Sequence, residues 1–157
     1  MSPLARLALA VLPVAAASLT GALMTAPNIP TWYAGLAKPV FAPPNWLFGP
    51  AWTILYAMMA LAAWRLLGVA PGTRGRAGAV AAFAVQLVLN AAWTPAFFGL
   101  HSPRAGLAVI GLLLVTILVT IRRTWPLDRV AAGLLVPYAA WVAFATVLNA
   151  EVARLNP

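Results

Sequence analysis

Two amide side chains, Gln86 and Asn90, lie one helical turn apart within an otherwise apolar stretch of the sequence. At roughly 100° per residue, Trp93 and Phe97 fall on the same face of a helix. Hydrocarbon offers no partners for amides, so such residues in a membrane span turn inward and often mark a ligand path. This face therefore predicts one wall of a site for a flat, apolar ligand with a few polar groups.

Two further stretches place aromatic rings and polar atoms on one helical face. The first face holds Trp52, Tyr56 and Met59, and the second holds Tyr138, Trp141, Ala145, Leu148 and Asn149. An alternative interpretation is a set of interhelical hydrogen bonds between core residues, the commonest use of such side chains in bundles. The number of tryptophans favours a ligand site as well, because each buried indole N–H needs a partner.

Residues of ordinary catalytic and metal sites are scarce. The chain has no cysteine and one histidine, His101, which excludes zinc ligation and bis-histidine haem ligation inside a bundle. Its two acids are Asp128, placed as a helix N-cap, and Glu151, near the end of the last apolar run. Without paired carboxylates or a nucleophile–base pair, we expect no metal, no obligatory cofactor and no hydrolytic chemistry.

Membrane-spanning helices are the elements that position these residues. Apolar residues make up 64% of the chain and charged residues 8%, whereas a soluble domain has about a quarter charged. Five apolar runs reach or approach the roughly 20 residues that cross the hydrocarbon. The sequence predicts an all-α membrane protein, a five-transmembrane-helix bundle forming a single domain over residues 1–157. The expected helices cover residues 5–26, 45–68, 76–100, 104–123 and 128–154.

The first apolar run also has features of a signal peptide, with Arg6 before it and small residues near Ala17. Its apolar character continues through Thr25, which is longer than a signal core, so we expect a retained helix.

The basic residues divide unevenly between the two sides of a five-span arrangement. One side holds Arg6, Arg65, Arg74, Arg76, Arg122, Arg123 and Arg129, and the other holds Lys38, Arg104 and Arg154. This bias predicts that the N-terminus lies in the cytoplasm. We expect a multi-pass protein of a bacterial cell membrane. The net charge of +8 then needs only membrane lipid as its partner, and no nucleic acid.

The longest connection, residues 27–45, is rich in proline and aromatic residues. Its prolines are Pro27, Pro30, Pro39, Pro43 and Pro44, and its larger side chains include Trp32, Tyr33, Leu36, Lys38 and Phe41. Proline fixes φ and removes backbone donors, so this is an ordered loop and not a helix. Two interpretations stand side by side: a loop covering the mouth of the bundle, and an interfacial aromatic belt.

A ridge of small residues lies opposite Gln86 and Asn90 on the third span. It consists of Ala77, Ala81, Ala84 and Val88. Association in a bilayer depends on close backbone approach through small residues, so the ridge predicts a homodimer interface. The alternative is that it packs against another span of the same chain.

Four motifs resemble the TspO/MBR family, which comprises the tryptophan-rich sensory proteins and the translocator proteins, also called peripheral benzodiazepine receptors. The first two are Trp32-Tyr33 with Lys38-Pro39, Pro43-Pro44 and Trp46, and Gly49-Pro50 with Trp52 and Leu55-Tyr56. The third and fourth are Gln86-Leu87, Asn90, Trp93, Pro95 and Phe97-Phe98-Gly99, and Pro137-Tyr138, Trp141, Phe144-Ala145 and Leu148-Asn149. These motifs cover nearly the whole chain in the family's order.

The resemblance implies a five-helix bundle, commonly dimeric, whose pocket lies under the first loop. It implies a receptor or carrier for tetrapyrroles such as protoporphyrin IX, and for sterols and benzodiazepine-type ligands, with a sensory, scavenging or transport role. The pocket residues carried over are Tyr33, Pro44, Leu47, Trp52, Gln86, Asn90, Trp93, Ala108, Leu112, Trp141, Ala145 and Leu148. One alternative is light- and oxygen-dependent degradation of bound porphyrin through Trp52 and Trp141, and another is a structural partner of other membrane proteins.

Two positions depart from the family pattern. Phe41 stands where many members have a tryptophan, so a ring is kept but an indole N–H is lost. Ala150 stands where the sterol-recognition pattern between Leu148 and Arg154 requires a tyrosine. The sterol-recognition pattern is therefore broken in this chain, and such patterns are weak evidence for sterol binding in any case.

Overall fold

The computed structural model describes residues 1–157 and is built from helices joined by turns, without strands. The helices are α1 (Pro3–Thr25), α2 (Phe48–Gly68), α3 (Arg76–Thr94), α4 (Pro103–Thr124), α5 (Arg129–Leu134) and α6 (Val136–Leu155). Five segments are long and apolar enough to cross a membrane: Pro3–Thr25, Asn45–Gly68, Arg76–Gly99, Pro103–Thr124 and Arg129–Leu155. The predicted all-α bundle of five membrane-spanning helices is confirmed.

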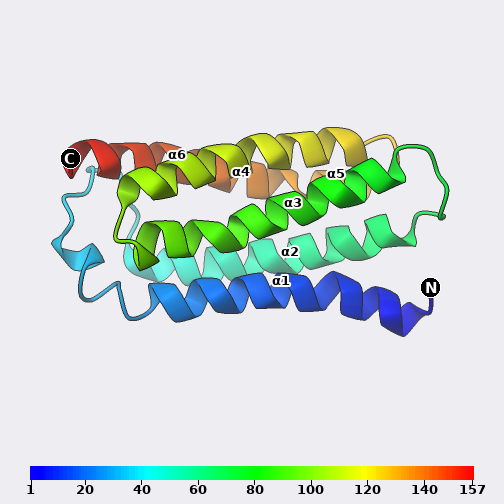
Figure 1. The fold of residues 1–157 in the computed structure, drawn as a ribbon, viewed down its shortest axis with the longest axis horizontal. Coiled ribbons are helices and arrows are strands. Elements are labelled where there is room, and N and C mark those ends of the chain that lie inside the picture. The colour runs from blue at the N-terminus through cyan, green and yellow to red at the C-terminus, as the bar shows by residue number, and fades with distance from the viewer.

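The spans lie side by side along the long axis of the molecule (Figure 1). Helix α3 packs against α4, α4 against α6, and α1 against both α2 and α3. The connection between α1 and α2 lies at the same end of the bundle as the C-terminus, and the N-terminus lies at the opposite end. This arrangement gives the bundle two chemically different ends, one covered by the long proline-rich loop and the other rich in arginine.

Three helices begin at a side chain that caps the backbone. Ser2, Ser102 and Asp128 each accept a hydrogen bond from the backbone N–H three residues further on, at 3.2, 3.2 and 2.8 Å. Such caps satisfy donors that have no partner within the helix. The predicted role of Asp128 as an N-cap is confirmed, although it caps the short helix α5.

The structure has two interruptions of the spans that the sequence analysis did not predict. Helix α3 continues as a π-helical turn over Pro95–Gly99, and the last span is broken at Leu135, between α5 and α6. Pro95 has no N–H, so a regular α-helical ladder cannot continue through it. The wider turn brings the adjacent rings of Phe97 and Phe98 into the interior, although a regular helix would point neighbours about 100° apart.

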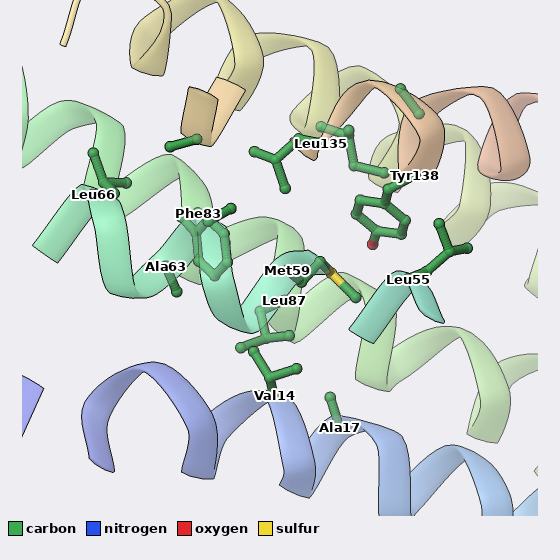
Figure 2. Close-up of a cluster of buried hydrophobic side chains, with 14 of the residues drawn as sticks. Val14, Ala17, Leu55, Met59, Ala63, Leu66, Phe83, Leu87, Leu135 and Tyr138 are labelled. Atoms are coloured by element: carbon green, nitrogen blue, oxygen red, sulfur yellow. The ribbon is translucent and has the colours of Figure 1, made fainter. Parts of the chain in front are cut away.

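The core is apolar and lies where the spans meet. Figure 2 shows Val14 and Ala17 of α1 facing Leu87 and Met59, with Tyr138 entering from α6. Many large apolar side chains on the outer faces stay exposed, among them Leu4, Leu12, Val88, Leu112 and Val147. Lipid tails solvate such side chains as well as a protein core does, so this outer surface suits a bilayer.

Candidate functional site

Four polar side chains from three helices form a buried network, which we call the polar core. The hydroxyl of Tyr138 donates to Gln86 Oε1 at 3.0 Å and accepts from Asn90 Nδ2 at 2.9 Å. Asn90 Oδ1 in turn accepts from the hydroxyl of Tyr56 at 2.8 Å. Gln86 is 1% exposed and Asn90 is 4% exposed. The polar core therefore ties α2, α3 and α6 together in the bundle interior.

The polar core satisfies nearly all of its own hydrogen-bonding groups. Only the amide nitrogen Nε2 of Gln86 is buried without a partner. Because a buried polar group without a partner is costly, the closed pairing of Asn90, Tyr56 and Tyr138 contributes to the stability of the packed bundle.

A second hydrogen-bonded relay lies closer to the loop end. The indole N–H of Trp93 donates to Asn149 Oδ1 at 3.1 Å, and Asn149 Nδ2 donates to the carbonyl of Pro103 at 2.7 Å. Gly106 makes this approach possible, because a Cβ there would lie 2.7 Å from Phe97 Cδ2 and 3.0 Å from Asn149 Oδ1. The relay therefore joins α3, α4 and α6 at a point of very close packing.

The α1–α2 connection is held over this end of the bundle from both sides. On one side, the ring of Trp32 stacks on His101 at 4.8 Å, and His101 Nε2 lies 2.9 Å from Asn28 Oδ1. On the other side, the side chain of Asn156 pairs with the backbone of Ala37, accepting at 3.1 Å and donating at 2.9 Å.

Two residues of this connection interact closely within it. Tyr33 is buried against Phe97 and Phe98, and its burial raises the pKa of its hydroxyl. Lys38 lies over the ring of Tyr33, with Nζ 4.6 Å from the ring centre, and donates to the carbonyl of Leu36 at 3.1 Å. The connection is thus an ordered lid with one cation, and it carries aromatic residues on its inner side.

An apolar groove lies beneath the lid, between α2 and α6, with a volume of about 670 Å³. Its lining comprises Phe41 and Pro43 of the lid, Leu47, Ala51, Ile54 and Leu55 at the start of the second span, and Pro137, Ala140, Trp141 and Phe144 of α6. The rings form a continuous set: the Phe144 ring centre lies 5.9 Å from that of Trp141 in a tilted geometry and 6.4 Å from that of Phe41 in an edge-on geometry. The volume falls within the range of about 300–1,000 Å³ typical of small-molecule sites.

Trp141 is the one groove residue with a buried polar atom that lacks a hydrogen-bond partner. Its indole nitrogen Nε1 is buried and has no hydrogen-bond partner. Phe48 packs edge-on against the same indole, with the ring centres 5.9 Å apart. An acceptor oxygen beside this nitrogen would restore the hydrogen bond that the indole lacks.

The structure brings only some of the residues proposed from the sequence to this groove. Leu47 and Trp141 line it. Trp52 does not line it, and its ring packs at a tilt against that of Tyr56 of the polar core, with the ring centres 5.4 Å apart. Tyr33, Trp93 and Leu148 pack in the aromatic cluster under the lid, Ala145 packs against the main core, Gln86 and Asn90 belong to the polar core, and Pro44 is exposed in the lid.

Two proposed pocket residues lie apart from all of these. Ala108 and Leu112 are exposed on the outer face of α4, and Leu112 is 60% exposed. The opposite face of the same helix carries the buried Ile110, Leu113 and Ile117. In this arrangement Ala108 and Leu112 face the surroundings of the bundle.

Most of the groove lining was missed by sequence reasoning, although a periodic signal was present. The second span offers Leu47, Ala51, Ile54 and Leu55, and α6 offers Pro137, Ala140, Trp141 and Phe144. Both sets follow the spacing i, i+3 or i+4, i+7 that marks one face of a helix. This signal does not distinguish a groove from a lipid-facing surface, because most of these residues are small or aliphatic and a helix face of the same composition is expected toward lipid.

The small-residue ridge of α3 faces outward. Ala77, Ala81, Ala84 and Val88 are all exposed along one side of the helix, whereas Ala79, Phe83 and Leu87 point into the core. No other span of the chain covers the ridge, so it is available to a second copy.

The sequence model of the TspO/MBR family matches residues 9–155 of the chain. The chain belongs to the TspO/MBR family. It is similar to the protein CrtK of Rhodobacter capsulatus, with 41% identity over 143 residues, covering 91% of this chain and 88% of the relative. It is also similar to the tryptophan-rich protein TspO of Archaeoglobus fulgidus, with 40% identity over 154 residues, covering 96% and 97%. The human translocator protein is 41% identical over 130 residues, covering 80% of this chain and 75% of the relative.

Membership of the TspO/MBR family and the five apolar spans together establish an integral, multi-pass membrane protein. The resemblance stated from the four motifs is confirmed.

Proposed function

We propose that this TspO/MBR protein is a membrane receptor or carrier that binds tetrapyrroles such as protoporphyrin IX in the groove between α2 and α6. The observation that supports this most is the groove itself, with an apolar volume of about 670 Å³ walled by the rings of Phe41, Trp141 and Phe144. A planar ring system buries its faces against such side chains, and a lined cleft of this size holds one ligand of that class.

The groove and lid also offer partners for the polar edge of a tetrapyrrole. The unpartnered indole N–H of Trp141 suits a carboxylate or carbonyl oxygen. Lys38 lies in the lid three residues before Phe41, and its ammonium suits a propionate. The sequence placed Gln86 and Asn90 in the pocket as its polar residues. In the structure neither lines the groove, Asn90 Nδ2 already donates to Tyr138, and Gln86 Nε2 is buried in the polar core.

The groove lining also suggests how the ligand enters. Ile54 is 61% exposed, and Ala140 and Pro137 are exposed beside it, so the groove is continuous with the outer, lipid-facing surface. An apolar ligand dissolved in the bilayer would then reach its site sideways, without passing through the lid.

Titration of the detergent-solubilised protein with protoporphyrin IX, followed by tryptophan fluorescence, tests the proposal. Saturable quenching is expected, and it should weaken in a Trp52→Phe/Trp141→Phe double variant, because Trp141 lines the groove and Trp52 lies on α2, which forms the facing wall. Quenching that never saturates, or that is unchanged in the double variant, would contradict the proposed site.

We propose in addition that two copies associate through the exposed ridge of α3, with the grooves facing away from the interface. Helices approach closely in a bilayer where their contact residues are small, as Ala77, Ala81 and Ala84 are. Replacing Ala81 and Ala84 with leucine should convert the dimer to a monomer in light-scattering measurements and leave porphyrin binding intact. A dimer that persists in this variant would place the interface elsewhere.

We propose that the protein resides in a bacterial cell membrane with its arginine-rich end in the cytoplasm, following the positive-inside bias. Labelling of Ser2→Cys and Asn156→Cys variants in intact cells checks this orientation, and only the second should react from outside. The opposite labelling pattern would reverse it.

A further inference from the structure

A small pocket of about 240 Å³ lies at the opposite end of the bundle from the lid and the groove. It forms where α1 begins, α2 ends and α5 begins, and it is lined by Arg6, Trp64, Arg65, Gly68, Val69 and Asp128. In contrast to the groove, its lining is mainly polar, with two guanidiniums and one carboxylate.

One of the two guanidiniums is fully paired. Arg65 makes two contacts to Asp128, from Nη2 to Oδ2 at 3.0 Å and from Nε to Oδ1 at 3.2 Å. Burial disfavours the charged carboxylate, but the hydrogen bond from the N–H of Ala131 and the guanidinium of Arg65 outweigh it and lower the pKa of Asp128. Asp128 is therefore a charged carboxylate that neutralises Arg65 and leaves the charge of the second guanidinium unbalanced.

The second guanidinium, that of Arg6, has no acidic partner. The chain has two acids, and both are in ion pairs with other residues, Asp128 with Arg65 and Glu151 with Arg154. The Arg6 side chain makes no hydrogen bond within the protein, and its Nε is buried. A partly buried cation with unused donors is costly unless an anion completes it.

The surroundings of Arg6 hold its planar group in one place. The guanidinium carbon lies 3.7 Å from the centre of the Trp64 ring, a cation–π contact. On α2, one turn further along, a Cβ at Gly68 would lie 2.5 Å from Nη1 of Arg6, so the guanidinium occupies space that only glycine leaves free. The Trp64 ring on one side and the space left by Gly68 on another therefore hold the guanidinium in a preformed cationic site.

We infer that this pocket binds the phosphate group of an anionic phospholipid, with Arg6 as its principal ligand. The flat fork of a guanidinium matches two phosphate oxygens, and an ammonium does not. The pocket lies at the ends of three membrane helices, which is the level of lipid headgroups, and at the arginine-rich end of the bundle. Basic pockets of this kind between transmembrane helices bind anionic headgroups.

Native mass spectrometry of the detergent-solubilised protein tests this inference, with phosphatidylglycerol and phosphatidylcholine of the same acyl chains as probes. We expect phosphatidylglycerol to bind more tightly, and Arg6→Gln to weaken its binding about tenfold, the effect of losing a hydrogen bond to a charged group. Arg74→Gln removes the same charge from an exposed loop at the same end and should change binding by less than about twofold in salt.

Two further variants separate a formed site from general attraction of charge. Arg6→Lys keeps the charge and loses the planar fork, and it should weaken phosphatidylglycerol binding nearly as much as Arg6→Gln. Gly68→Ala keeps Arg6 and displaces only the tip of its flexible side chain, so the fold should be retained while binding falls. Gly111→Ala, where a Cβ meets no neighbour within 4 Å, is its matched control.

Four results would overturn the inference. Equal binding of the two lipids would show that no anionic headgroup is recognised. Equal loss in Arg6→Gln and Arg74→Gln, or full binding in Arg6→Lys, would show general electrostatic attraction. Displacement of phosphatidylglycerol by millimolar inorganic phosphate, with phosphate protection against heat that depends on Arg6, would show that the pocket recognises a free anion and not a lipid.

Discussion

The polar core and the groove lie beside each other in the same bundle, and they use polar and aromatic residues in opposite ways. In the polar core, the hydroxyl of Tyr138 bonds to Gln86 Oε1 at 3.0 Å and to Asn90 Nδ2 at 2.9 Å, and only Gln86 Nε2 is left without a partner. In the groove, the indole of Trp141 is left without a partner, and the remaining walls are apolar. The difference teaches that a buried polar residue in a membrane helix indicates a ligand site only when it both lacks a hydrogen-bond partner and lines an open space, as Trp141 does and Gln86 does not. Changes in the polar core, or in the separate relay of Trp93 and Asn149, should therefore alter the stability of the fold. Changes in the groove should alter the affinity for the ligand.

The largest effect is expected at Gly106, next to the relay of Trp93 and Asn149. An added methyl group there would overlap Phe97 and press on Asn149 Oδ1, so Gly106→Ala should lower the free energy of unfolding by about 2–3 kcal/mol. Denaturation with increasing detergent strength, followed by circular dichroism, measures this. Gly111→Ala lies on the same helix with open space around it and should be neutral or slightly stabilising. Equal effects of the two substitutions would mean that the close packing at Gly106 does not exist.

A smaller loss of stability is expected from Asn90→Leu, which removes the centre of the polar core. Tyr56 loses its acceptor and Tyr138 loses its donor, so the free energy of unfolding should fall by about 1–2 kcal/mol. Protoporphyrin affinity of the folded protein should stay within about twofold, because Asn90 does not line the groove. A large loss of affinity with unchanged stability would return Asn90 to the ligand site that the sequence suggested.

The smallest effect on stability, with a measurable effect on binding, is expected from Trp141→Phe. The substitution removes an N–H that has no partner, so the free energy of unfolding should change by less than about 1 kcal/mol. Porphyrin affinity should weaken about three- to tenfold if the indole donates to the ligand. Trp125→Phe, at the exposed end of α4, controls for the loss of one indole. Equal affinities of the two variants would remove Trp141 from the site.

Several of these features can be predicted from the sequence, because they depend only on the residue pattern within one span. Apolar length predicts the five spans, and the 3.6-residue period places Gln86 and Asn90 inward and the ridge of Ala81 and Ala84 outward. The cap at Asp128 follows from its residue type before an apolar run. None of these inferences needs information about a neighbouring helix.

The remaining features depend on which helices meet, and one sequence does not contain that information. The hydrogen bonds of Gln86 and Asn90 are made with Tyr138, which lies on another helix about fifty residues further along the chain. The π-helical turn at Pro95–Gly99 and the break at Leu135 depend on local packing around prolines. The groove arises only where the matching faces of α2 and α6 lie together under the lid.

The most direct test of the central claim is a protoporphyrin IX titration of a variant in which the groove is filled. Ala51 lines the groove on α2, and Ala57 lies on the same helix, exposed and outside the groove. Ala51→Phe should weaken the apparent affinity about tenfold or more, because the added ring takes the space of the ligand and overpacking costs about 1–3 kcal/mol. Ala57→Phe should leave the affinity within about twofold. Unchanged affinity in Ala51→Phe, in a protein that still folds, would contradict the assignment of the groove as the tetrapyrrole site.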